Sequence, residues 1–137
     1  MRYLLDTDVI SQYTKPAPDP RVDAWIRRTD DRSLYICEIT YAELWYGIHL
    51  LAPGKRRIAL ENWVEDELYM QFFNRVLFFD LSTAKRYGSI VARAEKNGFR
   101  AGAMDAMIAA IAMENGMAVA TLNQKDFRRL GVEVVDF

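Results

Sequence analysis

The sequence predicts an α/β fold in which a central, mostly parallel sheet is flanked by helices. Short apolar runs of strand length alternate with longer segments of helical periodicity. This alternation favours parallel strands joined by helices, a three-layer arrangement with helices on both faces of the sheet. The chain has 137 residues, of which 51% are hydrophobic, and no linker, repeat or low-complexity tract divides it. We therefore expect one domain spanning residues 1–137.

The strands are expected where short, mostly apolar runs occur. These runs lie at residues 2–5, 33–37, 75–81, 117–122 and 132–137. Their length and their β-branched and aromatic content are typical of strands buried in a parallel sheet. The last run is expected to form only a short strand.

Helices are expected between these runs, at residues 8–13, 20–28, 40–50, 55–73, 82–96 and 103–114. The prolines of "KPAPDP" exclude a helix interior before Pro20, which itself suits a first helical turn. Thr40, with Glu43 three residues later, has the pattern of a capping box. Asp8 and Ser82 are expected to cap the first helix and the helix at 82–96. "APG" and "KNG" mark two of the helix ends.

Composition excludes several classes of protein. The net charge is -1, so any surface that binds nucleic acid must be local. The single cysteine, Cys37, allows no intramolecular disulfide, and the single histidine, His49, excludes zinc sites rich in His or Cys. The sequence shows neither a signal peptide nor an apolar run long enough to cross a membrane. We expect a cytoplasmic protein whose chemistry depends on oxygen ligands.

Acidic side chains are expected together at one edge of the sheet. Asp6 follows the first strand, and Asn123 and Asp126 follow the fourth. Glu43 and Asp105 lie near the starts of helices that adjoin strands two and four. Parallel α/β sheets bind ligands at the carboxyl ends of their strands. Four carboxylates gathered there would repel one another without a cation, which predicts a site for a hard divalent ion such as Mg²⁺.

Such a site suits the hydrolysis of phosphodiesters. Mg²⁺ takes one or two protein carboxylates and keeps open positions for water and phosphate oxygens. A bound ion can polarise a phosphoryl group and lower the pKa of a water ligand. Ligands that are all carboxylates disfavour Zn²⁺ and Cu²⁺.

Four motifs carry a resemblance to a known family. "LLDTDVIS", "ITYAELWYGI", "DAMIAAIA" and "ATLNQKDF", in this order and spacing, resemble the PIN-domain ribonucleases. The match is with the VapC toxins of type II toxin–antitoxin operons, including the FitB-like branch, and it covers essentially the whole chain. The resemblance implies a Rossmann-like PIN fold and metal-dependent endonuclease activity on RNA, with Mg²⁺ or Mn²⁺ as cofactor.

The resemblance also implies the catalytic residues. Asp6, Glu43 and Asp105 match the three acids of the family's metal site. We expect Asp6 and Asp105 to ligate the ion, and Glu43 either to ligate it or to orient the attacking water. Asp126 is the candidate for a fourth acid, because the neutral Asn123 occupies the other place where the family can have one.

Supporting residues follow from the same resemblance, and RNA contacts follow from the positions of basic residues near the acids. Thr7 and Thr121 match places where the family often has hydroxyl side chains, and Asn123 joins them as a supporting residue. Arg100 and Lys125 are the preferred contacts for RNA phosphates, because they adjoin the acids in the sequence. Other candidates are Arg128, Arg129 and the "KRR" run at 55–57.

The resemblance implies two protein partners, a second copy of the chain and a cognate VapB-type antitoxin. The family's antitoxin places its C-terminal segment in a hydrophobic groove that reaches the active site. The sequence has more aromatic residues than a small core easily buries. Those considered for the groove are Trp45, Tyr46, Trp63, Tyr69, Phe72 and Phe73.

Two alternative functions stay open from the sequence. A haloacid-dehalogenase-type phosphatase also begins with an apolar strand that ends in D-x-D. Asp6 would then be the nucleophile and Asp8 the general acid, although the chain lacks that family's late pair of acids. The second alternative is a PIN-like domain that binds RNA without cutting it.

Overall fold

The computed structural model describes all 137 residues and has a parallel sheet at its centre. The strands are β1 (Tyr3–Leu5), β2 (Leu34–Cys37), β3 (Val76–Leu77) and β4 (Ala118–Ala120). Their order across the sheet is β3-β2-β1-β4, and every pairing is parallel. The α/β class predicted from the sequence is therefore confirmed.

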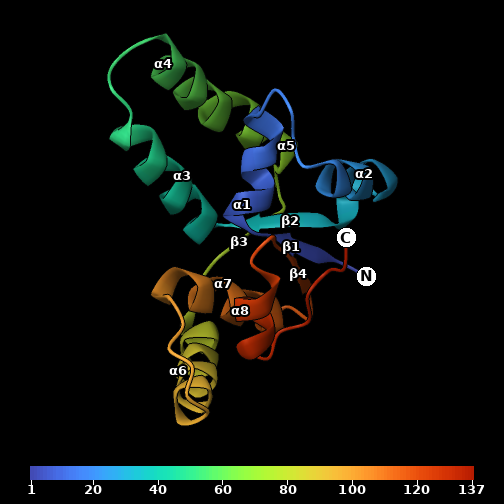
Figure 1. The fold of residues 1–137 in the computed structure, drawn as a ribbon, viewed down its shortest axis with the longest axis vertical. Helices are drawn as coiled ribbons and strands as arrows, with labels where there is room; N and C mark the ends of the chain where they lie inside the picture. The colour runs from blue at the N-terminus through green and yellow to red at the C-terminus, as the bar shows by residue number, and fades with distance from the viewer.

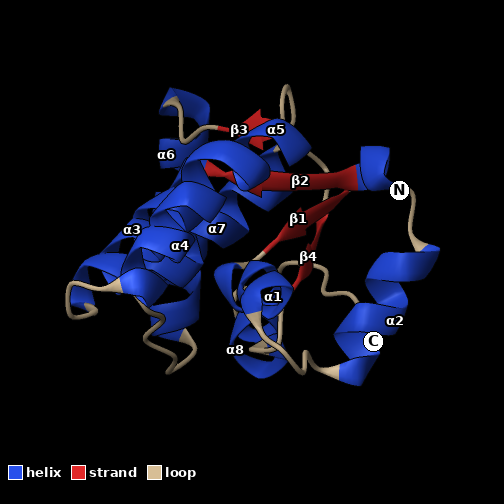
Figure 2. Cartoon of the chain, turned by 90° about the horizontal axis from the view of Figure 1, so that it is seen from above, coloured by secondary structure: helices blue, strands red, loops and turns tan.

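Helices cover both faces of the sheet (Figure 1). One face carries α1 (Thr7–Ile10), α2 (Pro20–Arg28), α3 (Glu38–Leu50), α4 (Lys55–Asn62) and α5 (Tyr69–Gln71). The other carries α6 (Leu81–Lys96), α7 (Ala103–Glu114) and α8 (Gln124–Arg129). Seen from above, the strands run between these helices (Figure 2). The three layers match the arrangement expected from the alternation of strands and helices.

The core consists of two clusters, one on each side of the sheet. Leu4 and Val119 pack with the buried side chains of α6, α7 and α8. Leu5 and Ala120 point to the opposite face and pack with those of α1, α2 and the segment at 55–73. This division follows from the alternation of side chains along a strand. The small residues of α7 let that helix lie buried close to the sheet, which places its first turn at the sheet's carboxyl edge.

Three predictions of helix caps were wrong. α3 begins at Glu38, directly after β2, and Thr40 lies buried within it, so Thr40 and Glu43 form no capping box. The strand runs into the helix without a loop, and no side chain caps α3. α6 is capped by Asp80, whose carboxylate accepts a hydrogen bond from the backbone N–H of Thr83 at 2.9 Å. The cap of α1 is likewise Asp6 rather than Asp8.

Other elements also differ from the predictions. The helix predicted at 55–73 is α4 followed by a π-helical segment, Trp63–Leu68, and the short α5. The predicted fifth strand is reduced to one parallel bridge between Val119 and Val134. α8 was not predicted, because its six residues are too few to show a helical period. None of the helices is long and apolar enough to span a bilayer.

Candidate active site

The site lies where the topology of the sheet reverses direction. β2 pairs with one side of β1, and β4 pairs with the other. The segments after β1 and β4 therefore diverge at the sheet's carboxyl edge, which is the usual place for a ligand in such folds. Asp6 follows β1 and Thr121 follows β4. The backbone N–H of Asp6 also bonds to the carbonyl of Ala120 at 2.9 Å, which joins the two segments.

Asp6 is the most deeply buried acid of the site, with 5% of its surface exposed. It is the N-cap of α1, and its Oδ1 accepts a hydrogen bond from the backbone N–H of Thr7 at 2.8 Å. Its Oδ2 accepts a bond from the hydroxyl of Thr121, also at 2.8 Å. Burial, with a further contribution from the charge of Asp8, raises the pKa of Asp6 to about 7. A cation next to Asp6 would relieve this cost of ionisation.

Asp8 belongs to the site, whereas we expected it to cap a helix and gave it a chemical role only in the phosphatase alternative. Its Oδ2 accepts hydrogen bonds from the backbone N–H of Leu122 at 3.1 Å and from the hydroxyl of Thr121 at 3.3 Å. Burial raises the pKa of the Asp8 carboxyl. Asp8 therefore ties the start of α1 to the segment after β4. The D-x-D spacing was the sequence signal for this role.

Glu43 reaches the site from α3. The hydroxyl of Thr7 donates a hydrogen bond to its Oε1 at 2.6 Å. Because α3 begins at Glu38, Glu43 lies in the second turn of the helix rather than in the first. Thr7, whose backbone N–H bonds to Asp6, thus ties Glu43 to the segment after β1, although the two acids are far apart in the sequence.

Asp105 lies in the first turn of α7 and faces the segment after β4. The side-chain amide of Asn123 donates a hydrogen bond to its Oδ2 at 3.1 Å. Burial raises the pKa of Asp105, and the nearby charges of Glu43 and Asp126 add to the shift. Asn123 therefore orients a carboxylate that burial and neighbouring charges make costly to ionise.

These side chains line one polar pocket of about 310 Å³ with no hydrophobic residue in its lining. The lining consists of Asp6, Thr7, Asp8, Ser11, Glu43, Asp105 and Asn123. It includes no Lys or Arg, and none of its acids forms a salt bridge. No three acidic, His or Cys side chains are arranged to hold one metal ion among them. The oxygen donors nevertheless fit Mg²⁺, which needs only one or two carboxylates.

Other predicted site residues lie outside this lining. Asp126 is half-buried in α8, and its charge acts on Asp105 from there. Lys125 is exposed beside it at the start of α8. Arg100 precedes α7, and its side chain is 90% exposed and lies 3.7 Å from a carboxylate oxygen of Glu95. Ser11, which does line the pocket, was not predicted as a site residue, although it ends the motif "LLDTDVIS".

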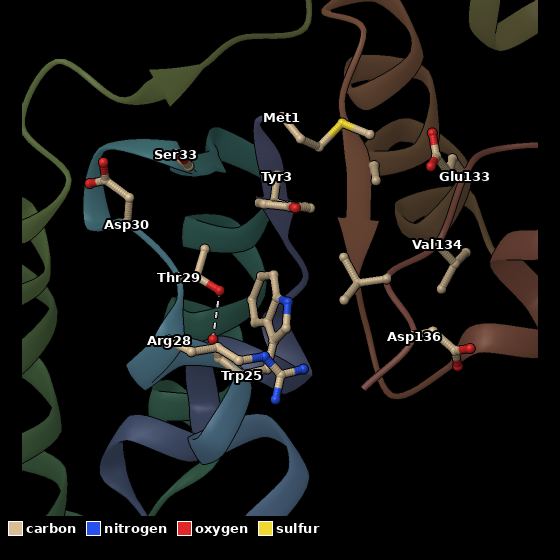
Figure 3. Close-up of a pocket in the computed structure, with 12 residues that line it drawn as sticks. Met1, Tyr3, Trp25, Arg28, Thr29, Asp30, Ser33, Glu133, Val134 and Asp136 are labelled. Atoms are coloured by element: carbon tan, nitrogen blue, oxygen red, sulfur yellow. Dashed lines mark hydrogen bonds between the residues drawn. The ribbon is translucent and has the colours of Figure 1, made fainter.

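A larger cavity, of about 660 Å³, is at the opposite edge of the sheet. Figure 3 shows the rings of Tyr3 and Trp25 on one side of it and Asp136 on the other. The two rings meet edge to face at 5.1 Å between centroids. Because Tyr3 begins β1, this cavity adjoins the amino ends of the strands, far from the acidic pocket.

A parallel sheet with an all-polar, carboxylate-lined pocket at its carboxyl edge is the arrangement expected of a PIN-type nuclease. The profile of the PIN domain matches residues 3–133, and the chain belongs to this family. It is 40% identical to the plasmid stability protein StbB of Pseudomonas syringae pv. tomato, covering 97% of this chain and 96% of that protein. It is 38% identical to the VapC ribonuclease Y4jK of Sinorhizobium fredii, with coverage of 97% and 95%.

The solved structures agree with this assignment. The crystal structure of FitAcB from Neisseria gonorrhoeae matches with a TM-score of 0.91 and 36% identity over 98% of this chain and 96% of that one. The FitB toxin of the same organism is 37% identical over 96% of this chain and 94% of its own length. The resemblance to VapC and FitB toxins seen in the sequence is thereby confirmed.

Proposed function

We propose that this protein is a metal-dependent endoribonuclease and the toxin of a type II toxin–antitoxin pair, with residues 1–137 acting as one domain. The pocket lined only by polar side chains, four of them carboxylates without a cationic partner, carries this proposal. Relatives named as VapC ribonucleases support RNA as the substrate. Its place of action would be the cytoplasm.

Asp6 and Asp105 are the proposed ligands of a Mg²⁺ or Mn²⁺ ion. Such an ion would polarise the scissile phosphate and lower the pKa of a bound water. Asp6 is held by Thr7 and Thr121, and Asp105 is held by Asn123, so both carboxylates are fixed before substrate binds. This preorganisation lowers the cost of binding the ion and the phosphate together.

Glu43 is the proposed acceptor of a proton from the attacking water. The bond from Thr7 fixes one of its oxygens and leaves the other for that water. As the water attacks phosphorus, its proton passes to Glu43, the bond from phosphorus to the leaving ribose oxygen breaks, and that oxygen takes a proton from solvent water. Asp126 is the proposed fourth acid, which adds negative charge beside Asp105. Arg100 and Lys125 remain the contacts proposed from the sequence for RNA phosphates.

A cognate VapB-type antitoxin and a second copy of the chain are the proposed protein partners. Solved relatives include FitAB and the VapBC of Salmonella typhimurium, both bound to DNA, and the FitB relative is named as a toxin. Phe72 is fully buried, but Tyr46, Tyr69 and Phe73 are each more than half exposed. Exposed aromatic surface of this kind is typical of interfaces between proteins.

The phosphatase alternative fits the pocket less well. Its nucleophile would be Asp6, but both oxygens of that carboxylate already accept hydrogen bonds, from the backbone of Thr7 and the hydroxyl of Thr121. Enzymes of that class also need a lysine at the site, and none lines this pocket. The second alternative, RNA binding without cleavage, shares the pocket and differs only in its activity.

The test is incubation of purified, antitoxin-free protein with a panel of RNAs, including tRNA and rRNA. We expect cleavage with Mg²⁺ or Mn²⁺, none with EDTA, and none for Asp105→Asn at a thermal midpoint no lower than that of the wild type. RNA binding without cleavage by the wild type would instead indicate a binding domain. Turnover of small phosphomonoesters through an aspartyl phosphate would indicate the phosphatase.

A further inference from the structure

A second pocket, of about 290 Å³, adjoins the acidic one and shares Thr7, Ser11 and Glu43 with it. We call it the side groove. Its apolar lining includes Leu44, Ile48, Leu51, Leu60 and Trp63, from α3 and the segment at 55–73. Two cations, Lys15 and Arg56, complete it. The side groove thus leads away from the carboxylates and carries the positive charge that the acidic pocket lacks.

The side chains of Lys15 and Arg56 have no interaction partner elsewhere in the structure. Both are exposed, and neither forms a salt bridge or a side-chain hydrogen bond. Their neighbour Arg57, by contrast, bonds to Glu61 at 3.0 Å and lies 2.9 Å from Nδ1 of His49. The charges of Lys15 and Arg56 are therefore free to meet a ligand.

Arg56 also violates a local rule of helix stability. α4 begins with Lys55, Arg56 and Arg57 and has no acid in its first turn. The amino end of a helix carries partial positive charge, so cations in the first turn are electrostatically unfavourable. Features that oppose local stability without a compensating contact are typical of functional positions.

We propose that the side groove holds a single strand of the RNA substrate, with Lys15 and Arg56 binding its phosphates on the approach to the acidic pocket. This inference rests on the proposed ribonuclease function. The apolar lining suits the face of an unpaired base, while the two cations suit the backbone on either side of it. Charge complementarity favours a polyanion over an uncharged peptide segment in the same place.

The experiment measures binding of a labelled single-stranded RNA at several NaCl concentrations, in an Asp105→Asn background that leaves the RNA intact. Each lost phosphate contact lowers the log–log salt slope by about 0.7 for a single strand. The double variant Lys15→Gln/Arg56→Gln should therefore lower the slope by about 1.4 and weaken binding roughly tenfold or more. Arg56→Lys should keep most of the slope.

The matched control removes the same charges elsewhere. Arg28 lines the cavity at the opposite edge of the sheet, and Lys85 is exposed in the first turns of α6. Arg28→Gln/Lys85→Gln should leave the salt slope unchanged. In the cleaving protein, the side-groove variant should raise KM with kcat changed less than about threefold, because uniform binding is lost.

The outcomes separate this inference from the proposed function. A wild type that cuts no RNA with metal overturns the function itself. A wild type that cuts RNA while the side-groove variant keeps its salt slope and KM overturns only the inference. Loss of inhibition by a co-expressed antitoxin, with RNA binding unchanged, would assign the side groove to a peptide and also overturn it.

Discussion

The hydroxyl of Thr121 lies 2.8 Å from Oδ2 of Asp6 and 3.3 Å from Oδ2 of Asp8. It has one proton, so it can donate to only one of the two carboxylates at a time. Its oxygen also accepts a bond from the backbone N–H of Asn123 at 3.0 Å. Thr121 is fully buried and thereby joins the segments after β1 and β4 at the centre of the site.

Replacing this hydroxyl should affect both stability and activity. Thr121→Val keeps the shape of the side chain but leaves buried polar partners unsatisfied, which costs about 1–3 kcal/mol of unfolding free energy. Thr121→Ser keeps the hydroxyl and should cost less than half as much. Urea denaturation measures the difference, and RNA cleavage should fall in the same order. Equal stability of the Val and Ser variants would show that the shared hydroxyl does not hold the site together.

The metal-free protein should lose stability as the pH rises toward neutrality. Burial raises the pKa of Asp6 to about 7 from its ordinary value of 3.8, so the folded state favours the protonated form. The contribution of Asp6 to the free energy of unfolding is complete below pH 3.8, the ordinary pKa. It is lost as the pH rises through about 7, the pKa in the folded state. Asp6→Asn cannot ionise and should be more stable than the wild type at pH 8, by at most ~4 kcal/mol.

Urea denaturation in EDTA at pH 5 and pH 8 tests this prediction. The advantage of Asp6→Asn should shrink at pH 5, where the wild-type carboxyl is mostly protonated. Asp66→Asn, at an exposed position on the π-helical segment, should follow the wild-type pH dependence. Cleavage should be abolished by Asp6→Asn alone. A wild-type stability that is flat between the two pH values would contradict the assignment of a raised pKa to Asp6.

Removing the hydrogen bond from Thr7 to Glu43 distinguishes two possible roles of Glu43, orientation of the attacking water and ligation of the metal ion. If Glu43 orients the attacking water, Thr7→Val should lower kcat by about tenfold or more while the affinity for Mn²⁺ stays unchanged. Thr7→Ser keeps the donor and should retain most of the rate. Calorimetric titration with Mn²⁺ supplies the affinity. A loss of Mn²⁺ affinity in the Val variant would instead make Glu43 a metal ligand.

The grouping of acids could be predicted because it depends on topology. Asp6 follows β1, Asn123 follows β4, and parallel strands bring their carboxyl ends to one edge whatever the details of the loops. The partners of each acid could not be predicted. That Asp8 bonds to Leu122, and Asn123 to Asp105, depends on the path of the segment after β4, which no periodic pattern encodes.

Helix boundaries that depend on a single capping hydrogen bond likewise could not be predicted from the sequence. Thr40 and Ser82 have the residue types of helix caps, yet β2 runs straight into α3 and Asp80 caps α6. Several polar residues near a helix start compete for one role, and the packing of the preceding strand decides which one has the right backbone geometry. The burial of individual aromatic residues could not be predicted either, since Phe72 is in the core while its neighbour Phe73 is exposed.

The cap of α6 provides a last prediction that is independent of the active site. The carboxylate of Asp80 accepts bonds from the backbone N–H and the hydroxyl of Thr83, both at 2.9 Å. Asp80→Ala removes this cap and should lower the unfolding free energy by about 1 kcal/mol. Asp80→Asn retains an acceptor and should lose only part of that.

Ser82→Ala is the matched control, because the hydroxyl of Ser82 donates only to an exposed contact with Glu114. It should cost less than about 0.5 kcal/mol, as surface substitutions usually do. Urea denaturation of the three variants gives the ranking, and RNA cleavage should stay at the wild-type level in all of them, because Ser82 bonds near the end of α7 farthest from Asp105. A greater loss of stability from Ser82→Ala than from Asp80→Ala would show that Ser82, as its sequence context suggested, begins the helix.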